Sequence, residues 1–89
     1  MQTEAQKWAD YDDAKQCLSL LISHYSALIY QTEQEQNPDA EKIAELEAAQ
    51  DQLFDVQADL DLNITVDDQD EIARLISVYG PMVQALRQG

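Results

Sequence analysis

The side chains with chemical potential in this 89-residue sequence are mostly carboxylates, because it has one histidine and one cysteine. Cys17 and His24 are seven residues apart in a segment predicted to be helical. That spacing separates them by about 10.5 Å along the axis, so they do not share a metal ion. No serine, histidine and acid lie near one another in sequence as a nucleophilic set. Glycines stand only at positions 80 and 89, which excludes a glycine-rich phosphate loop. We therefore expect no enzymatic activity and no cofactor.

Acidic residues outnumber basic ones by 18 to 5, which gives a formal net charge of −13 at pH 7. Such a surface repels phosphates and anionic headgroups, so we expect neither direct nucleic-acid binding nor membrane binding. Residues 43–73 include ten acids and no lysine, arginine or histidine. Four of these acids recur every four residues and are predicted to form a row on one helix face, opposite the apolar one. This row, called the acidic ladder below, consists of Glu47, Asp51, Asp55 and Asp59.

Like charges four residues apart destabilise a helix by about 0.2–0.5 kcal/mol per pair, so the three pairs of the ladder lower the stability of their helix by on the order of 1 kcal/mol. Its charges repeat about every 6 Å along the helix, a spacing that a phosphate-binding protein can accept. A second acidic group follows the ladder. We expect both groups to form the negative surface that binds a partner. The second group consists of Asp67, Asp68, Asp70 and Glu71.

Residues 59–70 resemble a calcium loop of the EF-hand kind, with oxygen-bearing side chains at loop positions 1, 3, 5, 9 and 12. Ile64 replaces the glycine that the sharp turn of such a loop needs, and an aspartate replaces the bidentate glutamate at the end. An acid-rich helix end followed by a capped connector is the alternative interpretation, and we favour it. The candidate calcium ligands are Asp59, Asp61, Asn63, Asp67 and Asp70.

Two long amphipathic helices are predicted to position these acids. The first spans about residues 3–34, with apolar residues from Tyr11 to Leu28 at alternating spacings of three and four. The second spans about residues 38–61, with Asn37 as N-cap and Pro38 at its first helical position. A short turn between two amphipathic helices is typical of an antiparallel helical hairpin.

The remaining chain predicts one or two short C-terminal helices. The third helix spans about residues 68–79, is capped by Thr65 or Asp67, and ends at Gly80 because Pro81 cannot continue it. A short helix over about residues 81–87 follows. The fold expected is all-α, a three- to four-helix bundle forming a single domain over residues 1–89. No secretory or membrane-spanning segment is recognisable, and the lone cysteine fits a reducing compartment, so we expect a cytoplasmic protein.

Two aromatic residues lie off the apolar stripe, near opposite ends of the first helix. Trp8 and Tyr30 are therefore predicted to contact a partner or a second copy of the chain in a homodimer. Tyr11 and Tyr25 lie on the stripe and are expected in the core.

In size, acidity and helical content the chain is similar to small inhibitors of nucleic-acid-binding proteins, among them nucleic-acid mimics and immunity or antitoxin proteins. That resemblance implies inhibition or sequestration of a basic, nucleic-acid-binding or nucleic-acid-processing protein, because acidic faces steer association with positive patches. The alternative is a self-associating structural or assembly protein whose acids serve only solubility or reflect an acidic proteome.

Overall fold

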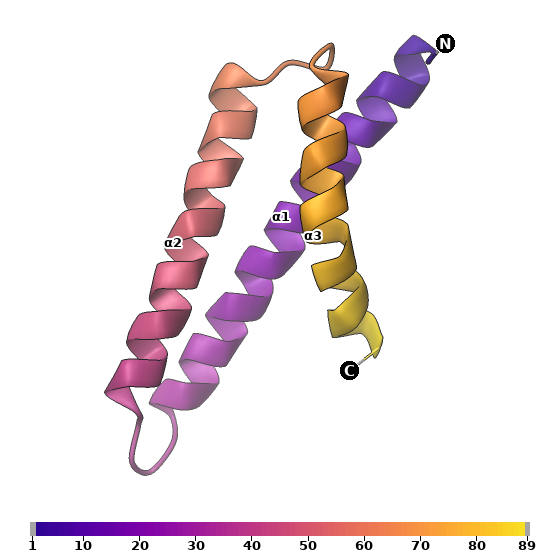
Figure 1. Ribbon diagram of the computed structural model, residues 1–89. Coiled ribbons are helices and arrows are strands. Elements are labelled where there is room, and N and C mark those ends of the chain that lie inside the picture. Colours follow the sequence, from indigo (N-terminus) through magenta and orange to yellow (C-terminus); the bar gives the residue numbers. More distant parts are fainter. Residues whose placement is uncertain (1, 89) are drawn as a thin grey trace.

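The computed structural model describes residues 2–88, and within them every regular element is an α-helix. The elements are α1 (Glu4–Glu33), α2 (Ala40–Asn63) and α3 (Gln69–Gln88). This arrangement confirms the prediction of an all-α fold. Figure 1 shows α2 returning alongside α1 in the opposite direction, with α3 crossing in front of α1, against which it also packs.

Helix α1 begins where its sequence provides a capping box. The Thr3 hydroxyl accepts a hydrogen bond from the Gln6 backbone N–H at 3.2 Å, and the Gln6 side chain accepts one from the Thr3 N–H at 3.0 Å. Both interactions satisfy N–H groups that a helix start leaves unpaired. The 30 residues of α1 extend about 45 Å and agree with the predicted range to within one residue at each end.

Helix α2 starts two residues later than predicted, with Asp39 as the N-cap instead of Asn37. One carboxylate oxygen of Asp39 accepts from the backbone N–H groups of Glu41 and Lys42, both at 3.1 Å. A carboxylate is a strong acceptor and is also favoured by the positive end of the helix dipole. Pro38 therefore belongs to the loop, and the prediction that it occupies the first helical position is wrong.

Helix α3 continues through the predicted break, with Pro81 inside it and Gly80 at a negative φ. The predicted end at residue 79 and the separate helix over 81–87 are therefore wrong. Apolar side chains continue at helical spacing from Ile72 to Leu86 across the break, and most pack on the core. Burial of this continuous stripe outweighs the local cost of the proline.

The residue directly before α3 is Asp68, so neither Thr65 nor Asp67 occupies the capping position. The Asp68 carbonyl accepts from the Ile72 N–H at 3.0 Å, which is the first bond of the helix. Its side chain instead accepts from the Thr65 N–H at 2.7 Å and so closes the connector between α2 and α3.

The core lies along α1, which packs against both other helices. No Cα of α2 comes within 8 Å of a Cα of α3. The radius of gyration is 15.3 Å, against about 12 Å for a compact domain of this length. The molecule is therefore elongated, with extents of 55 × 28 × 15 Å. The buried apolar residues are Ala14, Leu18, Leu21, Leu53, Leu60, Ile72, Leu75 and Val83.

Tyr11 and Tyr25, the aromatic residues expected in the core, are half-buried and pack against its edge. The Tyr11 hydroxyl donates a hydrogen bond to the Leu60 carbonyl at 3.3 Å and so joins α1 to the C-terminal end of α2. Within residues 2–88 no helix is both long enough and apolar enough to cross a membrane.

Candidate functional site

The acidic ladder lies on the solvent side of α2. All four of its residues are exposed and belong to one uninterrupted helix, whereas Leu53 and Leu60 on the opposite side are buried. Successive ladder residues are therefore separated by about 6 Å along the axis and rotated by about 40° around it. The four carboxylates form a shallow spiral that covers about 18 Å of the surface of α2.

No lysine or arginine among residues 2–88 forms a salt bridge with a ladder residue. Three of the five basic side chains are instead paired with other acids. Two of these pairs join α1 to α2 or to the α2–α3 connector, and the other two lie within α1 or α3. Within residues 2–88 no salt bridge therefore neutralises the ladder. The pairs are Lys7 with Glu4 (3.9 Å) and with Asp67 (3.4 Å), Lys15 with Asp61 (3.2 Å), and Arg74 with Glu71.

These pairs shift the titration of their members. A hydrogen bond and charge attraction from Asp61 raise the pKa of Lys15. The hydrogen bond from Arg74 lowers the pKa of Glu71, and the same bond raises the pKa of Arg74. The side chains of these pairs keep between 39% and 59% of their surface accessible to solvent, so the pairs hold side chains in place more than they stabilise the fold.

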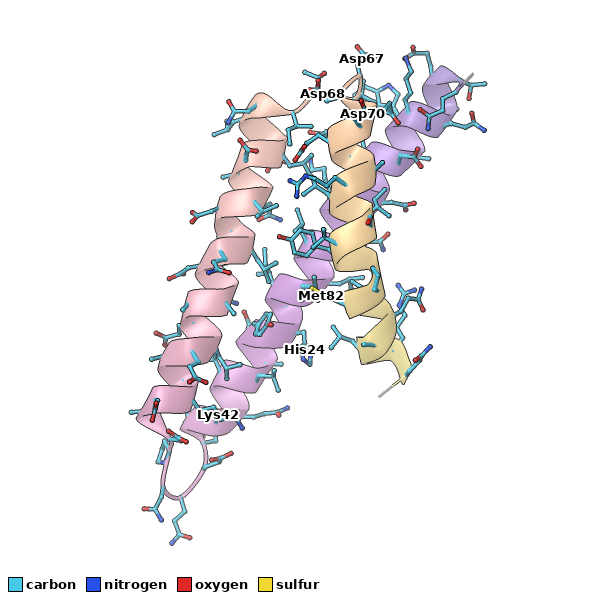
Figure 2. The ribbon with its side chains drawn as sticks, in the orientation of Figure 1. His24, Lys42, Asp67, Asp68, Asp70 and Met82 are labelled. Carbon is cyan, nitrogen blue, oxygen red and sulfur yellow. The ribbon has the colours of Figure 1, made fainter. Side chains whose placement is uncertain are left out.

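The second acidic group lies at the α2–α3 connector, where Figure 2 labels three of its members. Asp67 is paired with Lys7, Asp68 accepts from the connector backbone, and Glu71 is paired with Arg74. Asp70 makes no ion pair within the described chain. The eight predicted partner-binding residues therefore divide into an unpaired ladder and a group largely engaged in internal contacts.

The five candidate calcium ligands do not converge. Three of them lie within α2, where alternate residues project in different directions. Asp61 reaches Lys15 on α1, and the Asn63 amide donates to Asp59 at 2.8 Å. No group of three or more histidine, cysteine, aspartate or glutamate side chains in residues 2–88 is placed to hold a metal ion. The helix that continues through position 63 removes the loop that calcium would need.

The two remaining candidates for acid–base or thiol chemistry are isolated side chains. Burial, followed by the charge of Asp13, raises the pKa of the half-buried Cys17 thiol, so the thiolate is disfavoured. His24 is half-buried, with its ring at 6.0 Å from that of Tyr25. Neither side chain is paired with a group that would activate it as a nucleophile or a base.

Trp8 and Tyr30 are both largely exposed, at 53% and 65% of their surface. Trp8 packs edge-on against Tyr11, with ring centroids 5.9 Å apart. The two residues lie near opposite ends of the long α1, so a single small partner surface does not cover both. Their role as interface anchors stays a prediction.

A groove between α2 and α3 is a feature that the sequence patterns did not predict. It is lined by side chains of all three helices, and Met82 at its edge is 39% exposed. The apolar spacing that crosses Gly80 and Pro81 was the sequence signal for this groove, because a continuous α3 places Tyr79 and Met82 on the same helix face. The lining residues are Tyr25, Ala49, Gln52, Leu53, Tyr79 and Met82.

The molecule thus presents a row of exposed acidic residues on α2 and, toward α3, an apolar groove. Such an arrangement offers both charge and apolar contact to a binding partner. Comparisons of the chain with protein-family models, with curated proteins and with solved structures find no match.

Proposed function

We propose that this protein is a small, non-enzymatic binding protein that inhibits or sequesters a basic nucleic-acid-binding or nucleic-acid-processing protein. The observation that carries the proposal is the acidic ladder, whose four exposed carboxylates no basic side chain of the described chain neutralises. A partner that normally grips phosphates brings the lysine and arginine side chains that complement such a row.

The energy by which the ladder destabilises α2 supports a binding role for its acids. The pairs Glu47–Asp51, Asp51–Asp55 and Asp55–Asp59 are like charges at i,i+4 in one helix. Together they destabilise α2 by on the order of 1 kcal/mol. On binding, basic side chains of a partner remove this repulsion, and the long-range field of a molecule with net charge −13 accelerates the encounter.

The proposal is tested by the triple variant Asp51→Lys, Asp55→Lys, Asp59→Lys. A matched control changes Asp12, Glu33 and Glu35 to lysine, three exposed acids outside the ladder, so both variants have the same net charge. Wild type and both variants are tagged and used to capture proteins from the native host lysate at about 0.05 M and about 0.5 M salt. The Debye length shrinks about threefold across that range.

The proposal predicts that wild type and the control variant retain a basic protein at low salt and lose it at high salt, while the ladder variant does not retain it. The captured protein must also bind nucleic acid and release it when wild type is added. Circular dichroism checks that both variants keep their helix content. Equal capture of the basic protein by the ladder variant would contradict the proposal. Capture of nothing but further copies of the same chain at both salt concentrations would also contradict it and would favour a self-associating structural role.

A further inference from the structure

The three helices contact one another as three neighbouring members of a four-helix bundle would, with the fourth position empty. In a bundle of three, each helix packs against both others, whereas in a bundle of four the diagonal pair stays apart. Here α1 packs against α2 and against α3, but no Cα of α2 is within 8 Å of one of α3. Helices α2 and α3 are therefore placed like a diagonal pair, with the groove between them open to solvent.

The groove is largely apolar. Leu53 and Ala49 form its α2 wall, Tyr79 and Met82 its α3 wall, and Tyr25 of α1 contributes from below. Figure 2 shows the Met82 side chain extending from α3 toward the side on which α2 lies. Val78 is one turn before Met82 on the same side of α3 and is 45% exposed. Two apolar side chains on one helix face are thus exposed at the edge of an apolar groove.

One end of the acidic ladder lies on the same side of α2 as this groove. Its rotation of about 40° per step carries the last member, Asp59, to the side of α2 that faces α3. Gln52, seven residues earlier on the same side of α2, lines the groove, which agrees with that placement. Glu71 is the main cause that raises the pKa of Arg74 on α3, and the charge of Asp59 adds a smaller contribution.

A second copy of the chain is a poor occupant, because each copy has a net charge of −13. A basic occupant is favoured for the same reason. The space between two diagonal helices accepts a helix, since that is what completes the bundle, and apolar walls require an apolar stripe on it.

We propose that the groove between α2 and α3 binds an amphipathic helix with basic flanks, whose apolar stripe packs on Leu53, Tyr79 and Met82. Its lysines and arginines meet Asp59, the member of the acidic ladder on the side of α2 that faces α3. This inference rests on the proposed function, because it names the part of the basic partner that is held. It adds an apolar requirement that charge attraction alone does not impose.

The probe is a fluorescein-labelled peptide of about 18 leucine and lysine residues, with leucine at i, i+3, i+4 and i+7 so that a helix presents one apolar stripe. A control peptide has the same composition with the leucines scrambled. Fluorescence anisotropy at about 0.15 M salt measures the affinity of each peptide for the full-length protein. Because both peptides have the same charge, a difference between them reports the apolar stripe.

The groove variant combines Val78→Gln with Met82→Gln, two partly exposed positions, and the matched control is Leu62→Gln on the outer side of α2, where the leucine is 82% exposed. We expect the striped peptide to bind wild type at least about tenfold more tightly than the scrambled one. The groove variant should lose about tenfold or more, and the control variant less than about twofold. Circular dichroism checks that each variant is folded.

The outcomes separate the groove from the acidic ladder. Equal binding of both peptides that disappears only in the Asp51→Lys, Asp55→Lys, Asp59→Lys variant would overturn the groove inference and leave the proposed function standing. Failure to bind either peptide would also overturn it, while the lysate capture still decides the proposed function independently. Sedimentation of the protein alone provides a further check, since a dimer lost in the groove variant would assign the groove to self-association and overturn the inference.

Discussion

Replacement of Pro81 by alanine tests whether α3 is one helix, as the structure has it, or two helices separated at Gly80-Pro81. Pro81 is the thirteenth of the 20 residues of α3, well inside the helix. It has no N–H to donate to the carbonyl of Ser77, and its ring crowds that carbonyl. If the helix is continuous, Pro81→Ala restores one hydrogen bond and removes the crowding.

The expected gain follows from the helical position. Proline is about 3 kcal/mol less favourable than alanine inside a helix, so Pro81→Ala should raise the free energy of unfolding by roughly 2–3 kcal/mol. Gly80→Ala adds a second, dependent effect. Apart from its neighbours in the chain, a Cβ built at Gly80 meets Ile76 Cγ2 at 3.8 Å, which is ordinary contact. The helix-propensity gain of about 1 kcal/mol is therefore available once Pro81 is removed.

With Pro81 present, the same Cβ clashes with the proline ring when residue 80 is helical. Gly80→Ala should therefore stabilise the Pro81→Ala protein and stabilise wild type less or not at all. A double-mutant cycle of urea and thermal unfolding, followed by circular dichroism, measures this coupling. For a domain of this size each kcal/mol moves the midpoint by about 4–8 °C. An unchanged or lowered midpoint for Pro81→Ala, or equal effects of Gly80→Ala on both backgrounds, would refute a continuous α3.

Two further predictions concern the core and the acid range. Leu18→Ala, at a position with 0% exposure, should lower the free energy of unfolding by about 2–5 kcal/mol, whereas Leu20→Ala, 37% exposed, should cost below about 1 kcal/mol; equal losses in urea denaturation would contradict the assigned core. The pKa of Glu71 is lowered in the folded chain, so its contribution is present above its unfolded pKa and is lost as pH falls through the folded value. Wild type should therefore lose more stability than Glu71→Gln between about pH 6 and about pH 3, and identical acid profiles would show that the Arg74 pair contributes nothing.

The helical hairpin could be predicted because a helix that buries one face repeats its apolar residues about every 3.6 positions. Ala14, Leu18 and Leu21 lie on the stripe that the first helix predicted, and all three are buried. Leu53 and Leu60 are the corresponding buried residues of the second helix. A period of 3.6 residues survives local variation, since every apolar residue on the stripe adds to the same face.

Helix boundaries were harder to predict because several local signals compete within a few residues. Asn37, Pro38 and Asp39 all favour a helix start, and only the geometry selects the aspartate, whose carboxylate reaches two N–H groups. At Gly80 and Pro81 the local signal favours an end. Tyr79 and Val83 are nevertheless four residues apart, so a single stripe spans the pair and packing on α1 decides the outcome.

The helix face on which the acidic ladder lies depends only on residue spacing within α2. The sequence was therefore sufficient to place the ladder away from the buried Leu53 and Leu60. The pairs Lys15–Asp61 and Lys7–Asp67 were not predictable in the same way, because they join residues 46 and 60 positions apart. Their formation depends on how the helices are aligned with one another, which no periodicity within a helix contains. The groove between α2 and α3 depends on that alignment as well.

The distribution of charge argues for binding more than its amount does. A role in solubility requires only net charge, which dispersed acids supply without placing like charges four residues apart. In this chain three basic side chains are paired with acids outside the ladder, at junctions of the helices or within α3. The ladder, whose i,i+4 separation is unfavourable to α2, receives none. Under the proposed function a basic partner neutralises the ladder. Its last member, Asp59, lies on the same side of α2 as Gln52, which lines the apolar groove.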